Sequence, residues 1–188
     1  MCILKNSLVQ SHLLVESIVK NGDTVVDATA GNGNDTVFLA GLVGEEGLVY
    51  SFDIQERAIN ATLKKLEGKQ LNQRVKLIND GHQNMKAYIN GPVKAVMFNL
   101  GYLPGGDHSV GTRGNTTIAA VKSAMELVSL HGIISVVLYY GGDSGFDEKN
   151  QFMDFIKTID CRNFTVMQTE FVNQINCPPI LVCIEKTR

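Results

Sequence analysis

The sequence predicts a single α/β domain over residues 1–188. We expect a doubly wound, seven-stranded and mostly parallel sheet that ends in an antiparallel hairpin. Five apolar strand patterns alternate with helical patterns, as they do when helices cover both faces of a parallel sheet. The last two strand patterns are separated only by residues 173–179, a connection that is too short for a parallel crossover.

The first half of the chain alternates between helical periodicity and short apolar runs. Apolar residues recur at helical spacing over residues 8–19, and Asn21-Gly22-Asp23 ends that pattern. Uninterrupted apolar runs fit strands that are buried on both faces. The expected helices lie at residues 8–19, 36–43, 55–66 and 82–89, and the expected strands at 24–28, 48–52 and 75–78.

The second half repeats the alternation around a glycine-rich loop at residues 101–114. Further helices are expected at residues 117–129 and 146–159, and strands at 93–98, 133–139, 164–172 and 180–185. No helical pattern separates the last two strands, so they are expected to pair antiparallel.

Composition excludes several classes of protein. Hydrophobic residues make up 44% of the chain and charged residues 19%, which indicates a soluble globular protein. No apolar run approaches the roughly 18 residues that span a bilayer, and no signal-like pattern follows Met1, so a cytoplasmic protein without a membrane partner is expected. The net charge of −2 indicates no overall basic surface for nucleic acid, although a local basic rim or a dimer could still provide a basic surface. The four cysteines form no Cys-x-x-Cys pair, so we expect reduced thiols and no metal.

The most informative motif follows the first strand, where residues 27–36 read Asp-Ala-Thr-Ala-Gly-Asn-Gly-Asn-Asp-Thr. Glycines let a backbone approach a ligand closely, and the start of a helix presents free N–H groups. A carboxylate at Asp35 would repel the pyrophosphate of a dinucleotide. S-adenosylmethionine instead carries a sulfonium, an ammonium and one carboxylate. Asp27 and Asp35 suit the two cations, and the N–H groups of residues 31–33 suit the carboxylate. The alternative is a structural turn between strand and helix.

Polar residues at the ends of the second and third strands fit an adenosyl ligand. Asp53 stands 22 positions after Gly31, where a carboxylate accepts both hydroxyls of a ribose. Gln55 would lie beside the same ribose, and His82 after Gly81 would contact the adenine. Alternatively, Asp53 caps the following helix and His82 caps a short one.

The fourth strand leads into residues 99–107, which read Asn-Leu-Gly-Tyr-Leu-Pro-Gly-Gly-Asp. This stretch is similar to the Asn-Pro-Pro-Tyr loop of amino-group methyltransferases. There the Asn oxygen orients an amine and the aromatic ring stacks on the base that bears it. Asn99 is therefore the expected orienting residue and Tyr102 the stacking residue. Asp107, His108 and Tyr102 are candidates for the group that removes the proton of the amine. The alternative is a glycine-rich loop with a packing tyrosine.

These motifs resemble one family over essentially the whole chain: the small bacterial methyltransferases long described as rRNA methylases and now associated with the tRNA 5-(aminomethyl)-2-thiouridine methyltransferase. The resemblance implies a class I methyltransferase fold and methyl transfer from S-adenosylmethionine, giving S-adenosylhomocysteine. It also implies a wobble uridine in the anticodon loop of tRNA as substrate, a homodimer and a cytoplasmic location. The implied and expected cofactor residues are Asp27, Gly31, Asn32, Gly33, Asn34, Asp35, Asp53, Gln55, Gly81, His82 and Asn99.

The resemblance also bears on the residues expected to act in catalysis, which are Asn99, Tyr102, Asp107 and Tyr139. Tyr139 matches the tyrosine of a family motif after the fifth strand. Gly142 stands where that motif has histidine, and Asn34 stands where members often have histidine. If that histidine acts in catalysis or in binding tRNA, its role in this chain is open or is taken over by Tyr140 or Asp143.

Other functions remain open at this point. The chain could be an rRNA or small-molecule amine methyltransferase of the same fold, or a non-catalytic protein that binds a nucleotide or NAD. If the substrate is tRNA, cations on the rim are expected to contact phosphates; the candidates are Lys5, Lys86, Arg113 and Lys149. The alternative for these four is a solvated surface.

Overall fold

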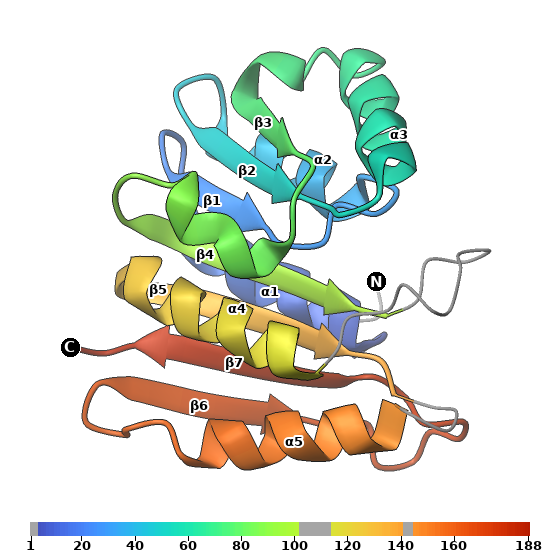
Figure 1. Cartoon of the computed structure of the whole chain (residues 1–188), viewed down its shortest axis with the longest axis vertical. Helices are drawn as coiled ribbons and strands as arrows, with labels where there is room; N and C mark the ends of the chain where they lie inside the picture. The colour runs from blue at the N-terminus through green and yellow to red at the C-terminus, as the bar shows by residue number, and fades with distance from the viewer. Residues whose placement is uncertain (1–3, 102–113, 141–144) are drawn as a thin grey trace.

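A seven-stranded sheet with helices on both faces forms the centre of the molecule (Figure 1). The computed structural model describes residues 4–101, 114–140 and 145–188. The strands are β1 (Thr24–Asp27), β2 (Leu48–Phe52), β3 (Val75–Ile78), β4 (Val93–Leu100), β5 (Val128–Leu138), β6 (Phe164–Thr169) and β7 (Ile180–Lys186). The α-helices are α1 (Ser7–Ile18), α2 (Asn34–Val43), α3 (Glu56–Glu67), α4 (Gly114–Leu127) and α5 (Gly145–Lys157), and the 3₁₀ helices are η1 (Asn72–Arg74) and η2 (His82–Ala87).

The strand order is β3-β2-β1-β4-β5-β7-β6. Strands β1 to β5 are parallel, and β7 runs antiparallel to both β5 and β6. The predicted fold class is confirmed, including the antiparallel pair at the end of the chain. The chain changes direction along the sheet between β1 and β4, and in open α/β sheets ligands bind at such a point, beyond the carboxyl ends of the strands.

The sheet separates two hydrophobic cores. One core lies between the sheet and η2, α4 and α5, and it includes the fully buried Phe98 of β4 and Phe152 of α5. The other contains side chains of α1, α2 and α3, including Val15 and Leu39. Because both faces are covered, the strands carry the nearly uninterrupted apolar runs that made them recognisable in the sequence.

Element boundaries differ from the sequence predictions at three points that matter for the site. Helix α2 begins at Asn34, two residues earlier than expected, so Asp35 lies in its first turn. Strand β4 extends through Asn99 to Leu100, where it still pairs with β5. Strand β6 ends at Thr169, which pairs with Leu181 near the start of β7. The chain beyond Thr169 has no strand partner and leaves the sheet.

The described residues offer neither a membrane span nor a metal cluster. Within residues 4–101, 114–140 and 145–188, no helix has the length and apolar character needed to cross a membrane. The same residues contain no group of three or more His, Cys, Asp or Glu side chains that could hold a metal ion. Cys161, Cys177 and Cys183 are free thiols, and of these three Cys183 is the buried one.

Candidate active site

The loop between β1 and α2 is held tightly against the sheet. The Ala30 N–H donates to the Phe52 carbonyl of β2 at 2.8 Å. Gly31 and Gly33 have φ angles of 52° and 75°, a left-handed conformation that favours glycine. A Cβ atom at Gly33 would lie 2.9 Å from Oγ1 of Thr62 in α3. Glycine at position 33 therefore allows α3 to approach the loop closely. Gly33 is also the residue that precedes α2.

Asp53 connects this loop to the next helix. Its Oδ2 accepts the N–H of Gly31 at 2.9 Å, and its Oδ1 accepts the N–H of Gln55 at 2.9 Å. The residue at the N-cap of α3 is Gln55, not Asp53, and its side chain makes no capping bond. An ionised carboxylate has about four acceptor positions, so two remain for hydroxyl groups. Contact with a ribose stays a prediction, and the residues present fit it.

Asp27 lies at the end of β1 and is completely buried. Its Oδ1 accepts the N–H of Thr29 at 3.0 Å, and its Oδ2 accepts the hydroxyl of Thr36 at 2.5 Å. Burial, with the nearby charge of Asp35 as the second cause, raises the pKa of Asp27 to about 7. Sequence analysis predicts a cofactor contact for Asp27. In this conformation Asp27 has no exposed surface and its hydrogen bonds hold the glycine loop, while a contact with the cofactor stays a prediction.

Asp35 joins three elements that are distant in the sequence. Its Oδ1 accepts the Nε2–H of His12 in α1 at 2.7 Å, and its Oδ2 accepts the Nδ2–H of Asn99 in β4 at 3.1 Å. The Asp35 side chain is only 5% exposed. The His12 ring stacks on Phe38, with ring centroids 4.0 Å apart and planes inclined by 6°. The predicted cofactor contact of Asp35 remains untested, and its two protein partners were not foreseen.

Asn99 and Tyr139 lie side by side at the carboxyl ends of β4 and β5. The backbone N–H of Asn99 donates to Oγ1 of Thr29 in the loop after β1 at 2.8 Å. The N–H of Tyr139 donates to the carbonyl of Leu100 at 2.9 Å. A Cβ atom at Gly101 would lie 3.2 Å from the Tyr139 ring, so the ring packs against Gly101. The pKa of Tyr139 is raised by partial burial and by the charge of Asp35. Asn99 is thus held by Thr29 of the glycine loop and by Asp35, and the Tyr139 ring packs nearby against Gly101.

The end of β3 holds the residues predicted to contact adenine. His82 is buried, and its Nδ1–H donates to the carbonyl of Ala28 at 3.0 Å. Burial lowers the pKa of His82, which favours the neutral ring. The Asp80 carboxylate accepts the N–H of Gly81 and the hydroxyl of Tyr88. The His82 side chain thus supports the loop after β1, and its contact with adenine stays a prediction.

The remaining predicted residues take different positions. Asn32 and Asn34 are exposed, and Oδ1 of Asn34 accepts a hydrogen bond from Lys65 at 2.7 Å. Six residues singled out in the sequence lie outside the described residues: Tyr102, Asp107, His108, Arg113, Gly142 and Asp143. The structure therefore brings together Asp35, Asp53 and Asn99 with the glycine loop and Tyr139.

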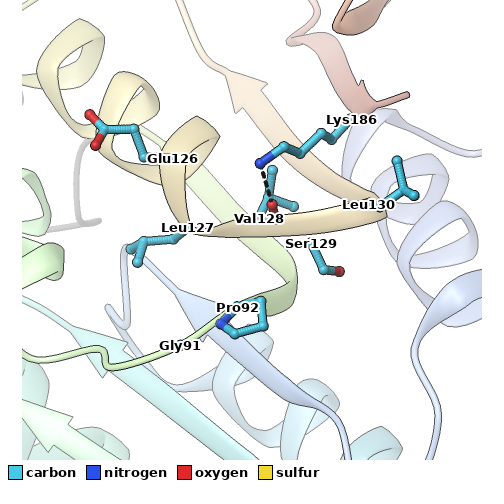
Figure 2. A pocket seen from close by; sticks show the side chains of 8 residues that line it. All are labelled: Gly91, Pro92, Glu126, Leu127, Val128, Ser129, Leu130 and Lys186. Atoms are coloured by element: carbon cyan, nitrogen blue, oxygen red, sulfur yellow. Dashed lines mark hydrogen bonds between the residues drawn. The ribbon is translucent and has the colours of Figure 1, made fainter. Parts of the chain in front are cut away.

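A separate hollow of about 510 Å³ opens at the amino ends of β4 and β5, away from the glycine loop (Figure 2). It is lined by Gly91, Pro92, Glu126, Leu127, Val128, Ser129, Leu130 and Lys186. The Lys186 amino group donates to the carbonyl of Val128 across it at 3.0 Å. These residues precede β4, end α4, begin β5 or end β7, and none was predicted to act in binding or catalysis. The candidate site is the polar cluster at the carboxyl ends of the strands, not this hollow.

Comparison with known proteins identifies the family. The model of the family described as "Putative rRNA methylase" matches residues 49–185. The chain belongs to this family. The crystal structure of a protein from Clostridium thermocellum with the same description is 63% identical, with a TM-score of 0.96 over 97% of this chain and 98% of that one. The crystal structure of a methyltransferase from Streptococcus mutans in complex with SAH is 42% identical, with a TM-score of 0.90 over 97% of this chain and 99% of that one.

A curated relative has a more specific description. The tRNA (mnm(5)s(2)U34)-methyltransferase of Arabidopsis thaliana, a chloroplastic protein, is 36% identical over 186 residues, which are 94% of this chain and 68% of that protein. The resemblance expected from the motifs is therefore confirmed at the level of the family. In this member of the rRNA methylase family, the polar cluster at the carboxyl ends of the strands is the candidate active site.

Proposed function

We propose that this protein transfers a methyl group from S-adenosylmethionine to the aminomethyl nitrogen of a wobble 5-(aminomethyl)-(2-thio)uridine in tRNA. S-adenosylmethionine is the cofactor and S-adenosylhomocysteine the product. The observation that carries the proposal is the position of Asn99, held by Thr29 at the edge of the glycine loop. An amide oxygen in that position can accept an N–H of an amine beside the methyl donor.

The residues around the glycine loop fit the methyl donor. Asp35 adds negative charge beside a ligand that carries a sulfonium and an ammonium, and Asp27, whose pKa is raised to about 7, adds part of a charge. The backbone N–H groups at the start of α2 suit a carboxylate, and Asp53 keeps acceptor positions for hydroxyl groups. When bound, S-adenosylmethionine supplies a methyl carbon attached to a positively charged sulfur. The protein supplies the position and the electrostatic environment.

The proposed chemistry is an in-line displacement. The amine nitrogen forms a bond to the methyl carbon as the carbon–sulfur bond breaks, and the bonding pair stays on sulfur. The product nitrogen then releases a proton. Holding the reacting groups in line can contribute about 7–11 kcal/mol to rate acceleration. Asn99 serves this alignment by accepting one N–H, so that the lone pair of the nitrogen is free to attack. The amine must be neutral at attack, and a negatively charged neighbourhood disfavours that form, so a proton acceptor is needed.

A tRNA substrate fits the chemistry of a loop nucleotide. An unpaired base in an anticodon loop can leave its stack and lie against an aromatic side chain. Tyr139 is 45% exposed and packs against Gly101, two residues after Asn99, so it is suited to this contact. Of the proposed phosphate contacts, Lys86 is paired with Glu126, and the Lys149 amino group lies 4.2 Å from the centroid of the Tyr140 ring.

A homodimer in the cytoplasm is also part of the proposal, because the family resemblance implies it. The connection between β6 and β7 exposes Val172 and Ile175, which are 95% and 83% exposed. Apolar side chains this exposed are often covered by a partner, and a second copy of the chain would cover them here. Light scattering coupled to gel filtration would test the dimer, and a monomer at all concentrations would contradict it.

The decisive experiment is mass spectrometry of tRNA nucleosides. Undermodified tRNA carrying the aminomethyl group would be incubated with the protein and labelled S-adenosylmethionine. We expect label in the methylaminomethyl nucleoside only. Label in rRNA or in a free amine, with none in tRNA, would favour the alternative acceptors. A thermal shift with NAD but not with S-adenosylmethionine would favour the nucleotide-binding alternative, because a ligand of the folded state raises stability.

A further inference from the structure

The Asp35 carboxylate is positioned between a histidine and the predicted orienting amide. Its Oδ1 is 2.7 Å from His12 Nε2, and its Oδ2 is 3.1 Å from Asn99 Nδ2. The three residues come from α2, α1 and β4. Asp35 is 4% exposed as a whole residue, so water does not replace these contacts easily. Such a buried arrangement holds each partner in one orientation.

The chemistry of this contact determines which end of the amide faces Asp35. An ionised carboxylate only accepts hydrogen bonds, and an amide offers donors only at nitrogen. The Nδ2 atom of Asn99 must therefore face Asp35, which leaves Oδ1 for another partner. Among residues 4–101, 114–140 and 145–188, none donates a hydrogen bond to Oδ1 of Asn99. Within this part of the chain, the acceptor atom of the side chain is kept available.

We propose that Asp35, itself held by His12, is a positioning residue that fixes the Asn99 amide with its oxygen available to the acceptor amine. This inference rests on the proposed function, in which Asn99 accepts an N–H of that amine. An amide can rotate by half a turn with little change in shape, so its orientation depends on its hydrogen bonds. A reversed amide would present N–H groups to the amine and would compete for the lone pair that attacks the methyl carbon.

His12 holds the Asp35 carboxylate in one orientation. Because Asp35 only accepts, the Nε2 atom of His12 carries the hydrogen of this bond. The ring is held by its stack on Phe38, and α1 is anchored nearby by the Ser7 hydroxyl, which donates to the Pro179 carbonyl. Two fixed donors on opposite oxygens prevent the carboxylate from turning away from Asn99. The arrangement resembles the way a carboxylate fixes a neighbouring side chain in other active sites.

The competing explanation is that Asp35 only joins α1 and α2 to the sheet. Exchanging the two side chains separates these explanations. In Asp35→Asn, the carboxylate oxygen facing Asn99 is replaced by an amide that must still satisfy His12 with its oxygen. Its nitrogen then faces Asn99, which must turn its own oxygen inward. In the double variant Asp35→Asn with Asn99→Asp, the amide nitrogen of residue 35 donates to a carboxylate, whose second oxygen remains available to the amine.

The experiment measures kcat and KM for undermodified tRNA, and cofactor affinity by calorimetry. We expect Asp35→Asn to lower kcat, measured at saturating cofactor, about 100-fold, the size of effect caused by a misplaced reacting group. Loss of the Asp35 charge is also expected to weaken cofactor affinity, which is why kcat is the quantity compared. The kcat of the double variant should be at least about tenfold higher than the kcat of Asp35→Asn. Asp154→Asn, which makes the same substitution at an exposed carboxylate on α5, is the matched control. A kcat of Asp35→Asn within about threefold of the unmodified protein, or a double variant no faster than Asp35→Asn, would overturn the proposal.

A second measurement needs no tRNA and therefore separates this inference from the proposed function. The side-chain NH₂ group of Asn99 can be observed by nuclear magnetic resonance in the free protein and assigned with Asn99→Ala. We expect one of its hydrogens to be shifted downfield by the carboxylate and to return upfield in Asp35→Asn. If tRNA is not methylated but this shift is seen, the proposed substrate is wrong and the orientation of Asn99 stands. An unchanged resonance in Asp35→Asn would refute the orientation itself.

Discussion

The hydroxyl of Thr36 donates to the buried carboxylate of Asp27 at 2.5 Å, and it also lies 2.8 Å from the hydroxyl of Ser51. This chain of three side chains joins α2 to β1 and β2 beneath the glycine loop. Because Asp27 is fully buried, its charge state affects the stability of the whole loop. The pKa of Asp27 rises from 3.8 to about 7 on folding, which makes the effect accessible to measurement.

Replacing Asp27 by Asn should change how stability depends on pH. The raised pKa means that the folded state holds a proton that the unfolded state releases. The stability due to this proton is fully present below about pH 4 and is lost as pH rises through about 7. The amide of the variant would mimic the protonated acid. We expect the free energy of unfolding of Asp27→Asn, relative to the unmodified protein, to rise by about 2–3 kcal/mol between about pH 5 and pH 8. Urea unfolding at several pH values would measure it, and a difference that is independent of pH would contradict it.

Replacing Gly33 by Ala should damage the loop in two ways. The residue has a φ of 75°, and the new Cβ would lie 2.9 Å from Thr62 Oγ1. Gly22→Ala is the matched control, because Gly22 has a φ of 89° but nothing within 4 Å of the new Cβ. We expect Gly22→Ala to cost about 1–2 kcal/mol of stability from backbone strain alone. Gly33→Ala should cost more and should also weaken cofactor binding, measured by thermal unfolding and calorimetry. Equal losses in the two variants would mean that crowding against Thr62 is unimportant.

Replacing Asn99 by Ala should affect turnover and not cofactor binding. The side chain contacts Asp35, while the backbone N–H that bonds Thr29 is retained. We expect kcat to fall by about 100-fold, as for removal of a group that positions the reacting atoms, with cofactor affinity nearly unchanged. Methyl transfer under saturating tRNA and cofactor titration would measure the two quantities. A parallel loss of both would assign Asn99 to cofactor binding instead.

Binding of tRNA should weaken steeply as salt is added. The chain has a net charge of −2, so affinity for RNA must come from local cations that release counterions on binding. We expect Lys149→Ala to reduce the salt slope by about one, because the Lys149 amino group lies over the Tyr140 ring at the rim of the sheet. Lys157→Ala, which removes a partner of Asp154 on the same helix, is the control. An affinity that does not depend on salt would argue against phosphate contacts.

Much of the fold was predictable because the apolar patterns of single segments agree with the way these segments pack in the sheet. Apolar runs such as residues 48–52 form strands that are buried on both faces, and the short connection after β6 admits only an antiparallel pair. The end of β6 was placed too late, at residue 172, because Val172 and its neighbours have strand-like sequence but no strand to pair with. Val172 is 95% exposed. Pairing with β7, which the local sequence of β6 does not encode, determines where β6 stops.

The candidate site was predicted less completely. Asp53 and Asn99 were recognised because each ends a strand, and strand ends of a parallel sheet converge. His12 was overlooked because its contact with Asp35 depends on how α1 packs against the sheet. A weak signal existed in the same helix. Ser7 and Ser11 lie four residues apart and are both buried, so α1 presents a partly polar face to its neighbours. The complete burial of Asp27 was not predictable, because its motif gives no indication of how deeply the side chain lies.

Helix α1 lies outside the sheet, yet it carries His12, the residue that holds Asp35 in the candidate site. It begins after Asn6, whose side chain accepts the N–H of Val9 at 2.9 Å, and it carries His12 further along. Any alteration that unwinds the start of this helix would release His12 from Asp35. An affinity tag or truncation placed close to Asn6 is therefore expected to disturb the candidate site, although it lies well before the glycine loop.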